Sequence, residues 1–397
     1  MLEVRDPIHG AMRISAEEIR VVDHPFVQRL RNILSTGFSY LPFPGATHSR
    51  YSHSLGVMFL AGKAFDSAYE AWIFEDPSTR DRFRKVVRLA ALCHDLGHSP
   101  FSHCTEFAMP LLPSLKLSWY GAAGEESRRA NHEDYTIAIL ETTSLADLIA
   151  ANFECSARHV AALISWDVPI EDDFFKDGGL DHREILSQII SSELDVDRMD
   201  YLIRDSYYSG ARYGQVDVGW LLTNLEAHPH DGRVSLALDS RAIYAFDDFM
   251  IARHHMFLMV YFHHKSVVYE ELIKRWVTCP DCDWQLPSNI SEYLYWDDSS
   301  LQVHLRNSTN EWAKRVVERR PYKRIFELHG TPEEVDLTNQ MSLLDELSVD
   351  YIAAGSTGKL SRYNVFGQKR DRAPRIHAVH RAQGPARPLP SSLRREG

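Results

Sequence analysis

The sequence lacks the features that mark membrane and secreted proteins. No uninterrupted apolar run in its 397 residues approaches the ~20 residues that span a bilayer. The first residues, Met1 to Asp6, have neither the basic nor the apolar region of a signal peptide. The five cysteines are an odd number in a long chain, which favours free thiols over a disulfide framework. We therefore expect a cytoplasmic protein that does not enter a membrane.

Strand signals are also scarce. The clearest is Gly232 to Leu238, where apolar residues alternate after an Asp-Gly turn and predict a short β-hairpin. Helical patterning dominates elsewhere, with candidate helices at 16–34, 54–71, 136–151, 157–164, 182–206 and 245–276, and another that ends near Cys93. The pattern predicts a mainly α fold: a helical bundle with a short β-hairpin insertion and a small C-terminal lobe.

Positive charge is scarce in the body of the chain. The formal net charge is −11, yet residues 361–397 hold nine Lys and Arg against two acids, which leaves −18 for the remainder. The average field therefore opposes nucleic-acid binding, and local patches must do any anion binding. Composition divides the chain into a helical core at 1–278, a small lobe at 279–370 and a basic tail at 371–397, which we expect to be disordered.

A histidine and an aspartate stand side by side at the end of an apolar run, as His94 and Asp95. They offer a nitrogen and an oxygen ligand to one cation at a helix edge, which Gly97 would help to expose. His53 and Asp197 would complete a site of two histidines and two aspartates, suited to Mn, Fe, Zn, Ni or Mg. Among 20 histidines a chance His-Asp pair is expected, and such residues also bond backbone, so the joint pattern carries the hypothesis.

More polar residues follow the doublet: His98, His103, Glu106 and His132. His103 and Glu106 are three apart, a spacing that places two side chains on one helical face. A histidine paired with a carboxylate can transfer a proton, and a metal ion lowers the pKa of bound water. This combination favours hydrolysis. Cations that could hold phosphate oxygens lie in or near the same segments: Arg50, Arg198, Arg204, Arg212 and Lys265.

Four segments carry a resemblance to a known family: Arg5 to Gly10, Phe43 to Val57, Leu92 to His103 and Asp195 to Asp205. They resemble the HD-domain phosphohydrolases, and within them the deoxynucleoside triphosphate (dNTP) triphosphohydrolases of the dGTPase and SAM-and-HD-domain type, without the SAM domain. The resemblance covers residues 1 to about 275 and is poor in the last third. It implies an HD-domain helical bundle.

The resemblance also implies roles for individual residues. The implied metal ligands are His53, His94, Asp95 and Asp197. His103, Glu106 and His132 match positions near the α-phosphate that assist the attack of water and the departure of triphosphate. Substrate contacts are implied for Arg50, His98, Arg198, Tyr201, Asp205, Tyr261 and Lys265. The implied reaction is metal-dependent cleavage of a dNTP to deoxynucleoside and inorganic triphosphate, by a homo-oligomer that is a dimer, tetramer or hexamer.

The sequence departs from the family at two places. Many relatives have Gln-Leu where this chain has Ser35-Thr36, so its sugar selectivity is open. Asp23, Gln28 and Arg31 match a regulatory guanine-nucleotide pocket, but Leu2-Glu3 replace the basic residue that accompanies them. We therefore expect nucleotide activation to be weak or absent.

Two other classes of function stay open. One is an HD-type phosphodiesterase or nucleotidase that acts on other phosphate esters. The other is a non-enzymatic protein that senses nucleotides or binds nucleic acid through the basic tail, which we do not expect. Two motif-like segments are interpreted as incidental: Cys279 to Cys282, half of a zinc knuckle, and 353–360, an imperfect phosphate loop.

Overall fold

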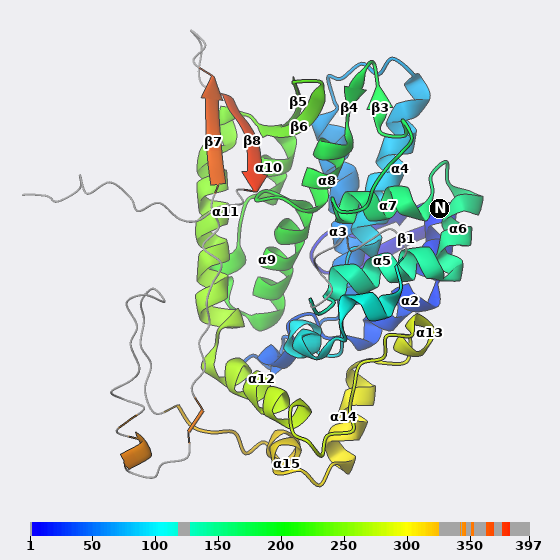
Figure 1. Cartoon of the computed structure of the whole chain (residues 1–397). Helices are drawn as coiled ribbons and strands as arrows, with labels where there is room; N and C mark the ends of the chain where they lie inside the picture. The colour runs from blue at the N-terminus through cyan, green and yellow to red at the C-terminus, as the bar shows by residue number, and fades with distance from the viewer. Residues whose placement is uncertain are drawn as a thin grey trace, which may run out of the picture.

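The computed structural model describes residues 2–117 and 128–324, and short pieces at 342, 344–346, 351–352, 363–368 and 375–381. Helices dominate these residues (Figure 1), which confirms the mainly α prediction. None of the described helices is long and apolar enough to cross a membrane.

Three helices at the centre of the molecule position the candidate site. They are α3 (Arg50–Ala68), α4 (Pro77–Cys93) and α9 (Val196–Ser209). Helix α3 packs against both of the others. Helix α4 begins at Asp76, whose carboxylate accepts a hydrogen bond from the Ser78 amide and caps the helix. Gly210, at a φ of 74°, ends α9 in the left-handed conformation that glycine adopts without strain.

The other helices surround this centre (Figure 1). They are α1 (Ala16–Val22), α2 (Pro25–Arg29), α5 (His132–Thr142), α6 (Ser144–Asn152), α7 (Ala157–Ile164), α8 (Arg183–Ile190), α10 (Val218–Thr223), α11 (Ile243–Met256), α12 (His264–Val277), α13 (Ile290–Tyr293), α14 (Asp298–Asn307) and α15 (Glu311–Val317). The short helices are η1 (Leu30–Asn32), η2 (Gly37–Tyr40), η3 (Ser102–Ala108), η4 (Leu112–Leu115), η5 (Arg212–Gly214), η6 (Ser240–Ala242) and η7 (Phe257–Tyr261).

Four predicted helices are interrupted in the structure. The helix predicted at 136–151 is divided into α5 and α6 at Thr143, whose side chain caps the second helix. The helix predicted at 16–34 breaks before Pro25, which starts α2, because proline cannot continue a helix in its interior. The helix predicted at 182–206 is divided into α8 and α9 where Asp195 caps the second helix. The helix predicted at 245–276 contains the π-helical turn η7 between α11 and α12. Apolar periodicity located these helices but not their breaks.

The β-hairpin prediction is confirmed. Strands β5 (Leu225–His230) and β6 (Arg233–Leu238) pair antiparallel, with Leu225 opposite Leu238. Asp231 and Gly232 between them have φ angles of 48° and 76°, as a tight hairpin turn requires. A second hairpin, β1 (Leu2–Asp6) with β2 (Gly10–Ile14), was not predicted. Buried and exposed residues alternate on β2 but not on β1. The alternation of apolar and polar residues that would predict a strand is therefore confined to a few positions.

Strand β6 belongs to a larger sheet with the order β3, β4, β6, β8, β7 among the described residues. Its other members are β3 (Lys176–Asp177), β4 (Leu180–Asp181), β7 (Tyr363–Gln368) and β8 (Arg375–Arg381). Strand β8 lies within the tail that we expected to be disordered, and it pairs with β6. Its seven residues contain Ile376 and Val379 and neither proline nor glycine, a composition compatible with a strand. The rest of the tail lies outside the described residues.

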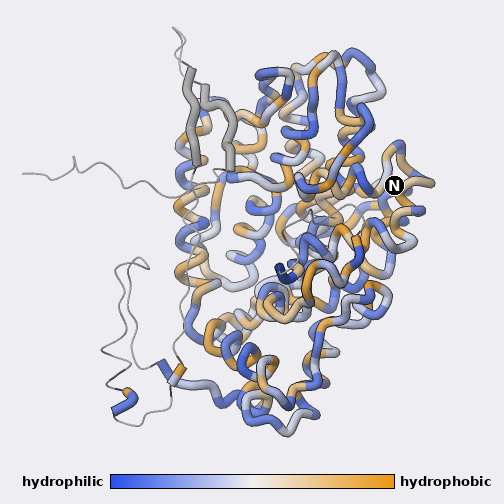
Figure 2. Tube along the Cα trace, viewed as in Figure 1, coloured by the Kyte–Doolittle hydropathy of each residue, from blue (hydrophilic) through white to orange (hydrophobic). Residues whose placement is uncertain are grey.

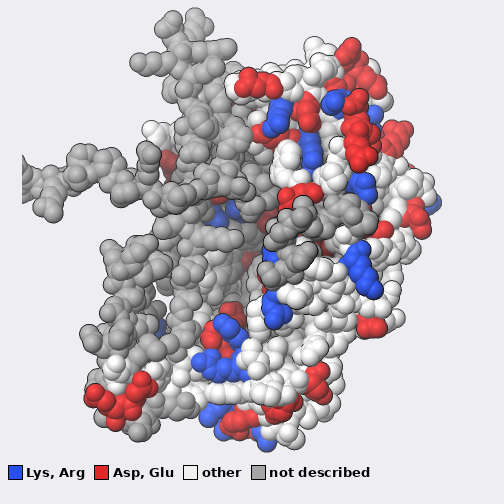
Figure 3. All heavy atoms as spheres, in the orientation of Figure 1, with Lys and Arg blue, Asp and Glu red and all other residues white. Residues whose placement is uncertain are grey.

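The segment after α12 packs on the helical core. The carboxylate of Asp298 accepts hydrogen bonds from the backbone amides of Leu34, at 2.9 Å, and Phe101, at 2.6 Å. The Tyr293 hydroxyl donates to the Gly97 carbonyl at 2.8 Å. Apolar and polar residues alternate along the described helices (Figure 2). Basic and acidic side chains are mixed over the face of the molecule that Figure 3 shows. The domain boundaries drawn from composition stay a prediction.

Candidate metal centre and active site

Four side chains meet where α3, α4 and α9 converge. His53 lies in the first turn of α3, His94 and Asp95 directly follow α4, and Asp197 lies in the first turn of α9. The Nε2 atom of His53 is 3.0 Å from Asp197 Oδ1 and 3.6 Å from Asp95 Oδ2. The Nε2 atom of His94 is 3.3 Å from Asp95 Oδ1 and 3.6 Å from Asp197 Oδ1. The structure thus brings together all four residues predicted as metal ligands.

These distances fit a divalent cation. Ligands at about 2.0–2.2 Å from an ion lie roughly 3 to 3.5 Å from one another. The Nε2 atom of His94 is also buried and has no hydrogen-bond partner among the described residues, which leaves its lone pair for a metal. The ligand atoms of His53, His94 and Asp95 all lie within 4.8 Å of one another. Two imidazole nitrogens and two carboxylates therefore form a suitable donor set.

The second nitrogen of each histidine is already bound by the protein. His53 Nδ1 is 2.8 Å from Asp200 Oδ2, and His94 Nδ1 is 2.8 Å from the Ala91 carbonyl oxygen. A proton on each Nδ1 satisfies these acceptors and leaves Nε2 free to bind a metal. Arg50 Nη1 donates to Asp95 Oδ2 at 2.7 Å and fixes that carboxylate. All three side chains are held in place by the protein itself.

Asp200 is the centre of a buried network that supports His53. Arg204 donates to both oxygens of Asp200, at 2.7 and 2.9 Å, and also to Asp6, at 2.8 Å. His9 Nε2 lies 2.6 Å from Asp200 Oδ1. The network therefore joins α9 to the N-terminal hairpin beside the site. Sequence analysis gave Asp200 and His9 no role, because residues 191 positions apart meet only in the fold.

Gly56 makes room for this network. A Cβ atom at this position would lie 2.0 Å from Asp200 Oδ1 and 2.5 Å from Arg204 Nη2. Gly97 has a similar role, since its Cβ would lie 2.0 Å from the His132 carbonyl oxygen. Both glycines therefore permit close approach of segments that carry site residues.

Charge at the metal centre is strongly coupled. Burial opposes a charge on His53, but Asp197 and Asp200 outweigh it and raise the pKa of His53 to about 10. Burial likewise opposes the charge on Asp197, and His53 and His94 lower the pKa of that carboxyl. The carboxylates thus favour a cation between them, which a proton or a metal ion can supply.

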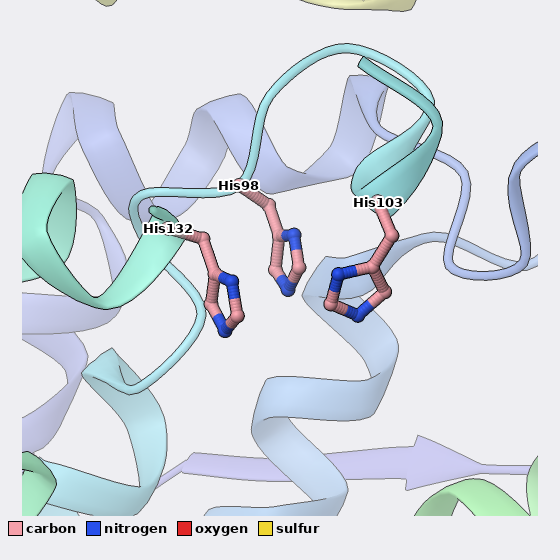
Figure 4. Close-up of side chains that lie close together, drawn as sticks. All are labelled: His98, His103 and His132. Atoms are coloured by element: carbon pink, nitrogen blue, oxygen red, sulfur yellow. The ribbon is translucent and has the colours of Figure 1, made fainter. Parts of the chain in front are cut away.

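A second group consists of His98, His103 and His132, which Figure 4 shows close together, and of Glu106 beside them. Glu106 joins two of the histidines, with Oε1 2.6 Å from His132 Nδ1 and Oε2 2.9 Å from His103 Nδ1. The rings of His98 and His132 stack with centroids 4.1 Å apart. His98 Nε2 is 3.2 Å from Asp95 Oδ1, so this cluster borders the metal centre. The structure brings together the three predicted catalytic residues.

The loop that carries this cluster has an unusual backbone. Phe101 and Ser102 both have positive φ angles, 57° and 59°, which cost of order 1–3 kcal/mol each for residues other than glycine. Asp298 holds the Phe101 amide, and Arg50 Nε donates to Ser102 Oγ at 2.9 Å. The surrounding structure therefore fixes the turn between His98 and His103.

Neighbouring histidines in the cluster have different pKa shifts. Burial, together with the charge of Arg50, holds the pKa of His98 well below its usual range. Burial also opposes charge on His132, but the ion pair with Glu106 outweighs it and raises the pKa of His132. A neutral and a protonated imidazole can thus stand side by side, an arrangement that suits proton transfer.

A third group extends along α9 from the metal centre. Asp197, Tyr201 and Asp205 are spaced by four residues and share one face of the helix. Asp205 accepts a hydrogen bond from the Tyr261 hydroxyl at 2.6 Å, and its other oxygen lies 2.7 Å from His48 Nε2. The rings of Tyr201 and Tyr261 are 6.1 Å apart. Three predicted substrate contacts therefore lie together, and His48 joins them.

Comparison with known proteins identifies the family. The HD domain model matches residues 50–205, and the model of the HD associated region matches residues 216–346. This chain belongs to the HD-domain family. The family consists of metal-dependent phosphohydrolases, and the four-residue centre is a group that could hold such a metal. The second match crosses residue 278, where composition predicted a boundary.

Several relatives of this HD-domain protein are known. The chain is 30% identical to an uncharacterized protein of Methanocaldococcus jannaschii, over 82% of this chain and 60% of that protein. It is 34% identical to the deoxynucleoside triphosphate triphosphohydrolase SAMHD1 of Homo sapiens, over 53% of this chain and 34% of that protein. A crystal structure of a hypothetical protein from Aquifex aeolicus is similar with a TM-score of 0.66 and 25% identity, covering 93% of this chain and 86% of that one. The chain spans less than two thirds of the curated relatives' length.

Two arginines of the HD domain that were predicted to bind substrate are engaged within the protein. Arg50 is buried and donates to Asp95, Ser102 and the Ser35 carbonyl. Arg198 forms an ion pair with Asp195, the cap of its own helix. Lys265 is exposed at the start of α12. These three bonds use three of the five guanidinium N–H groups, so Arg50 holds Asp95 in place and keeps two N–H groups for a further acceptor.

The residues matched to a regulatory pocket lie at the surface. Arg31 Nε donates to Gln28 Oε1 at 2.8 Å, and its guanidinium lies 3.6 Å from the centroid of the Tyr51 ring. Asp23 is exposed at the end of α1. Cys279 and Cys282 are free thiols in a turn, as interpreted from the sequence, and Cys93, Cys104 and Cys155 are free as well. The glycine-rich segment 353–360 lies outside the described residues.

Proposed function

We propose that this HD-domain protein hydrolyses deoxynucleoside triphosphates to deoxynucleoside and inorganic triphosphate. The observation that carries the proposal is the order of three groups: the histidine cluster, the metal centre, and the Asp205–Tyr261 pair along one face of α9. A phosphate at the centre would have proton-transfer groups on one side. Hydroxyl and carboxylate groups that can bind a sugar hydroxyl would lie along α9.

His53, His94, Asp95 and Asp197 would hold the metal ion. When bound, a divalent cation there polarises a phosphate oxygen and lowers the pKa of a bound water. Hydrolysis breaks the bond between the α-phosphorus and the 5′ oxygen, so that oxygen must receive a proton. His132, whose pKa the ion pair with Glu106 raises, is the proposed donor, and His98 and His103 complete the polar wall around the phosphate.

The relatives support the substrate class. The human relative and that of Dictyostelium discoideum, 35% identical over 52% of this chain, are both named as deoxynucleoside triphosphate triphosphohydrolases. Other relatives matched over more of the chain are uncharacterized. The family match thus supports the phosphohydrolase chemistry, and the dNTP substrate is supported by some of the relatives.

The test is to incubate the purified full chain with each dNTP and each ribonucleoside triphosphate, with Mn, Mg or Fe supplied separately. Chromatography identifies the products. Deoxynucleoside plus triphosphate is the expected result. Release of monophosphate, or turnover only of phosphodiesters and other esters, would replace the proposal with the phosphodiesterase or nucleotidase alternative. Addition of GTP tests our expectation that activation is weak.

We also propose that the protein acts in the cytoplasm as a homo-oligomer. Helix α11 and the turn η7 expose large apolar side chains, including Tyr244 at 79% and Ile251 at 53% exposure. A second copy would cover them. Light scattering of the full chain should give a mass above that of the monomer.

The basic tail is not expected to take part in catalysis. A deletion of residues 371–397 should therefore leave dNTP hydrolysis intact.

A further inference from the structure

A pocket of about 350 Å³ lies between the hairpin β1–β2 and helices α3 and α4. Cations dominate its lining: Arg13 from β2, Lys63 from α3, and Arg84 and Arg88 from α4. The ring of Phe59 also lines it, and Glu3 is the single carboxylate found there among the described residues. A concentration of cations is notable in a chain whose formal net charge is −11.

The sequence of α3 is adapted to this arrangement. Gly62 lies in the interior of a 19-residue helix, where glycine costs about 1 kcal/mol relative to alanine. A Cβ atom at Gly62 would lie 2.7 Å from Arg88 Nη1 and 3.3 Å from Arg84 Nη2. The glycine therefore lets two guanidinium groups lie across α3 beside Lys63.

The four cations are not equally committed to the protein. Arg84 binds Asp66 through Nε and Nη2, and Arg88 binds Glu18 through the same two atoms. Arg13 stands opposite Glu3 in the hairpin register, and within the described residues no ion pair of 4.0 Å or less joins Arg13 or Lys63 to a carboxylate. The Lys63 ammonium lies 4.5 Å from the centroid of Phe59. Arg13 and Lys63 thus remain available to bind an anion, whereas Arg84 and Arg88 are held in place by their carboxylate partners.

The pocket is separate from the metal centre. Phe59 and Lys63 follow His53 by six and ten residues on α3, which places them about 9 and 15 Å further along the axis. At about 100° per residue they also point to a different side of the helix from His53. Arg84 precedes His94 by ten residues on α4. A phosphate bound at the metal centre would therefore not occupy this pocket.

We propose that this pocket binds a small phosphorylated anion. The pocket is within the size range of small-molecule sites. Its guanidinium and ammonium groups can bind phosphate oxygens with charge-assisted hydrogen bonds. Arg13 and Lys63 supply the uncommitted charges, whereas Arg84 and Arg88, whose charges are offset by Asp66 and Glu18, supply guanidinium N–H groups that those ion pairs do not use. The proposal does not depend on which substrate the metal centre hydrolyses.

The test measures binding where the metal centre cannot contribute. The full chain with Asp197→Ala is titrated calorimetrically with inorganic triphosphate in the presence of a chelator. Binding at one site per chain is expected, weakened about tenfold or more by adding Arg13→Ala and Lys63→Ala. ATP in place of triphosphate distinguishes the source of the phosphate: tighter binding of ATP would indicate a nucleotide, and equal binding an inorganic anion.

The matched control removes the same charge elsewhere. Arg20→Ala with Lys85→Ala changes two exposed cations outside the pocket and should alter affinity by less than about twofold. All four cations are exposed, so neither pair should prevent folding. The proposal is overturned if the parent binds no triphosphate or ATP, or if the pocket pair and the control pair bind equally well.

Discussion

The metal centre and the histidine cluster beside it differ in how firmly the protein holds them. At the metal centre the side chains of His53, Asp95 and His94 are 2%, 4% and 12% exposed, and Asp197 at its edge is 33% exposed. In the cluster His98 is 1% exposed, whereas His132 and His103 are 21% and 63% exposed. The Nδ1 atoms of the two metal-centre histidines bind separate groups, the Asp200 carboxylate and the Ala91 carbonyl, whereas those of His103 and His132 share the half-buried carboxylate of Glu106. Under the proposed function, the metal ligands are therefore held by the core and its edge, while the proposed proton donor lies in a part that solvent reaches. Substitutions in the two parts should therefore have separable effects.

The largest effect is expected for Asp197→Ala, which removes a metal ligand. Metal binding and turnover should be lost together, with turnover falling by about a thousandfold or more, because metal polarisation of the phosphate is worth several kcal/mol. Metal content is measured by mass spectrometry and turnover with the dNTP panel. Asp173→Ala, at an exposed carboxylate, is the control. Normal turnover by Asp197→Ala would remove this residue from the site.

The next largest effect is expected for His132→Gln, in the more exposed histidine cluster. Loss of a general acid typically costs 10²–10⁴-fold in rate, so kcat should fall by roughly that factor. Metal content should stay unchanged, because His132 is not among the four ligands. His230→Gln, at a histidine whose side chain is 72% exposed, serves as the control. A loss of metal together with activity would show that the two parts are not separable.

A smaller effect is expected for Asp200→Asn, which tests the support of the buried part. The asparagine amide cannot accept the hydrogen bonds from His53, His9 and Arg204 as the carboxylate does. Because His53 is then less firmly oriented, metal affinity should fall about 10–100-fold. Excess metal should restore much of the turnover, which a general loss of folding would not allow. Asp66→Asn, at a half-exposed ion pair on α3, should leave metal affinity unchanged. Equal affinities in the two variants would contradict the positioning role.

The fold was predictable where local chemistry is strong. Apolar periodicity located the helices, and the Asp231-Gly232 turn located the β5–β6 hairpin, because both signals depend on neighbours in sequence. The break at Pro25 is also a local signal, because proline does not continue a helix in its interior. The β1–β2 hairpin and the pairing of β8 with β6 were not predicted, since strand pairing is a long-range property.

The site shows the same division between residues predictable from local sequence and residues that meet only in the fold. Residue chemistry selected His53, His94, Asp95 and Asp197, and the structure places them together, although their roles stay a prediction. The supports of these residues could not be predicted, because Arg204 and His9 link Asp200 to Asp6 across almost 200 residues of sequence. Arg50 shows the converse, because its charge suggested phosphate binding while the fold directs it to Asp95.

The smallest effect is expected for Tyr261→Phe, which removes one hydrogen bond to Asp205 at the end of the site furthest from the metal ligands. A hydrogen bond to a charged group contributes about 1.5–3 kcal/mol, so KM for a dNTP should rise about ten- to a hundredfold while kcat changes less. Metal content should not change, and hydrolysis of a small ester without a sugar should be unaffected. Tyr295→Phe, at a tyrosine 76% exposed after α13, is the control. If dNTP and small ester respond alike, the Asp205–Tyr261 pair does not bind the sugar, and the exposed part of the site ends at the histidine cluster.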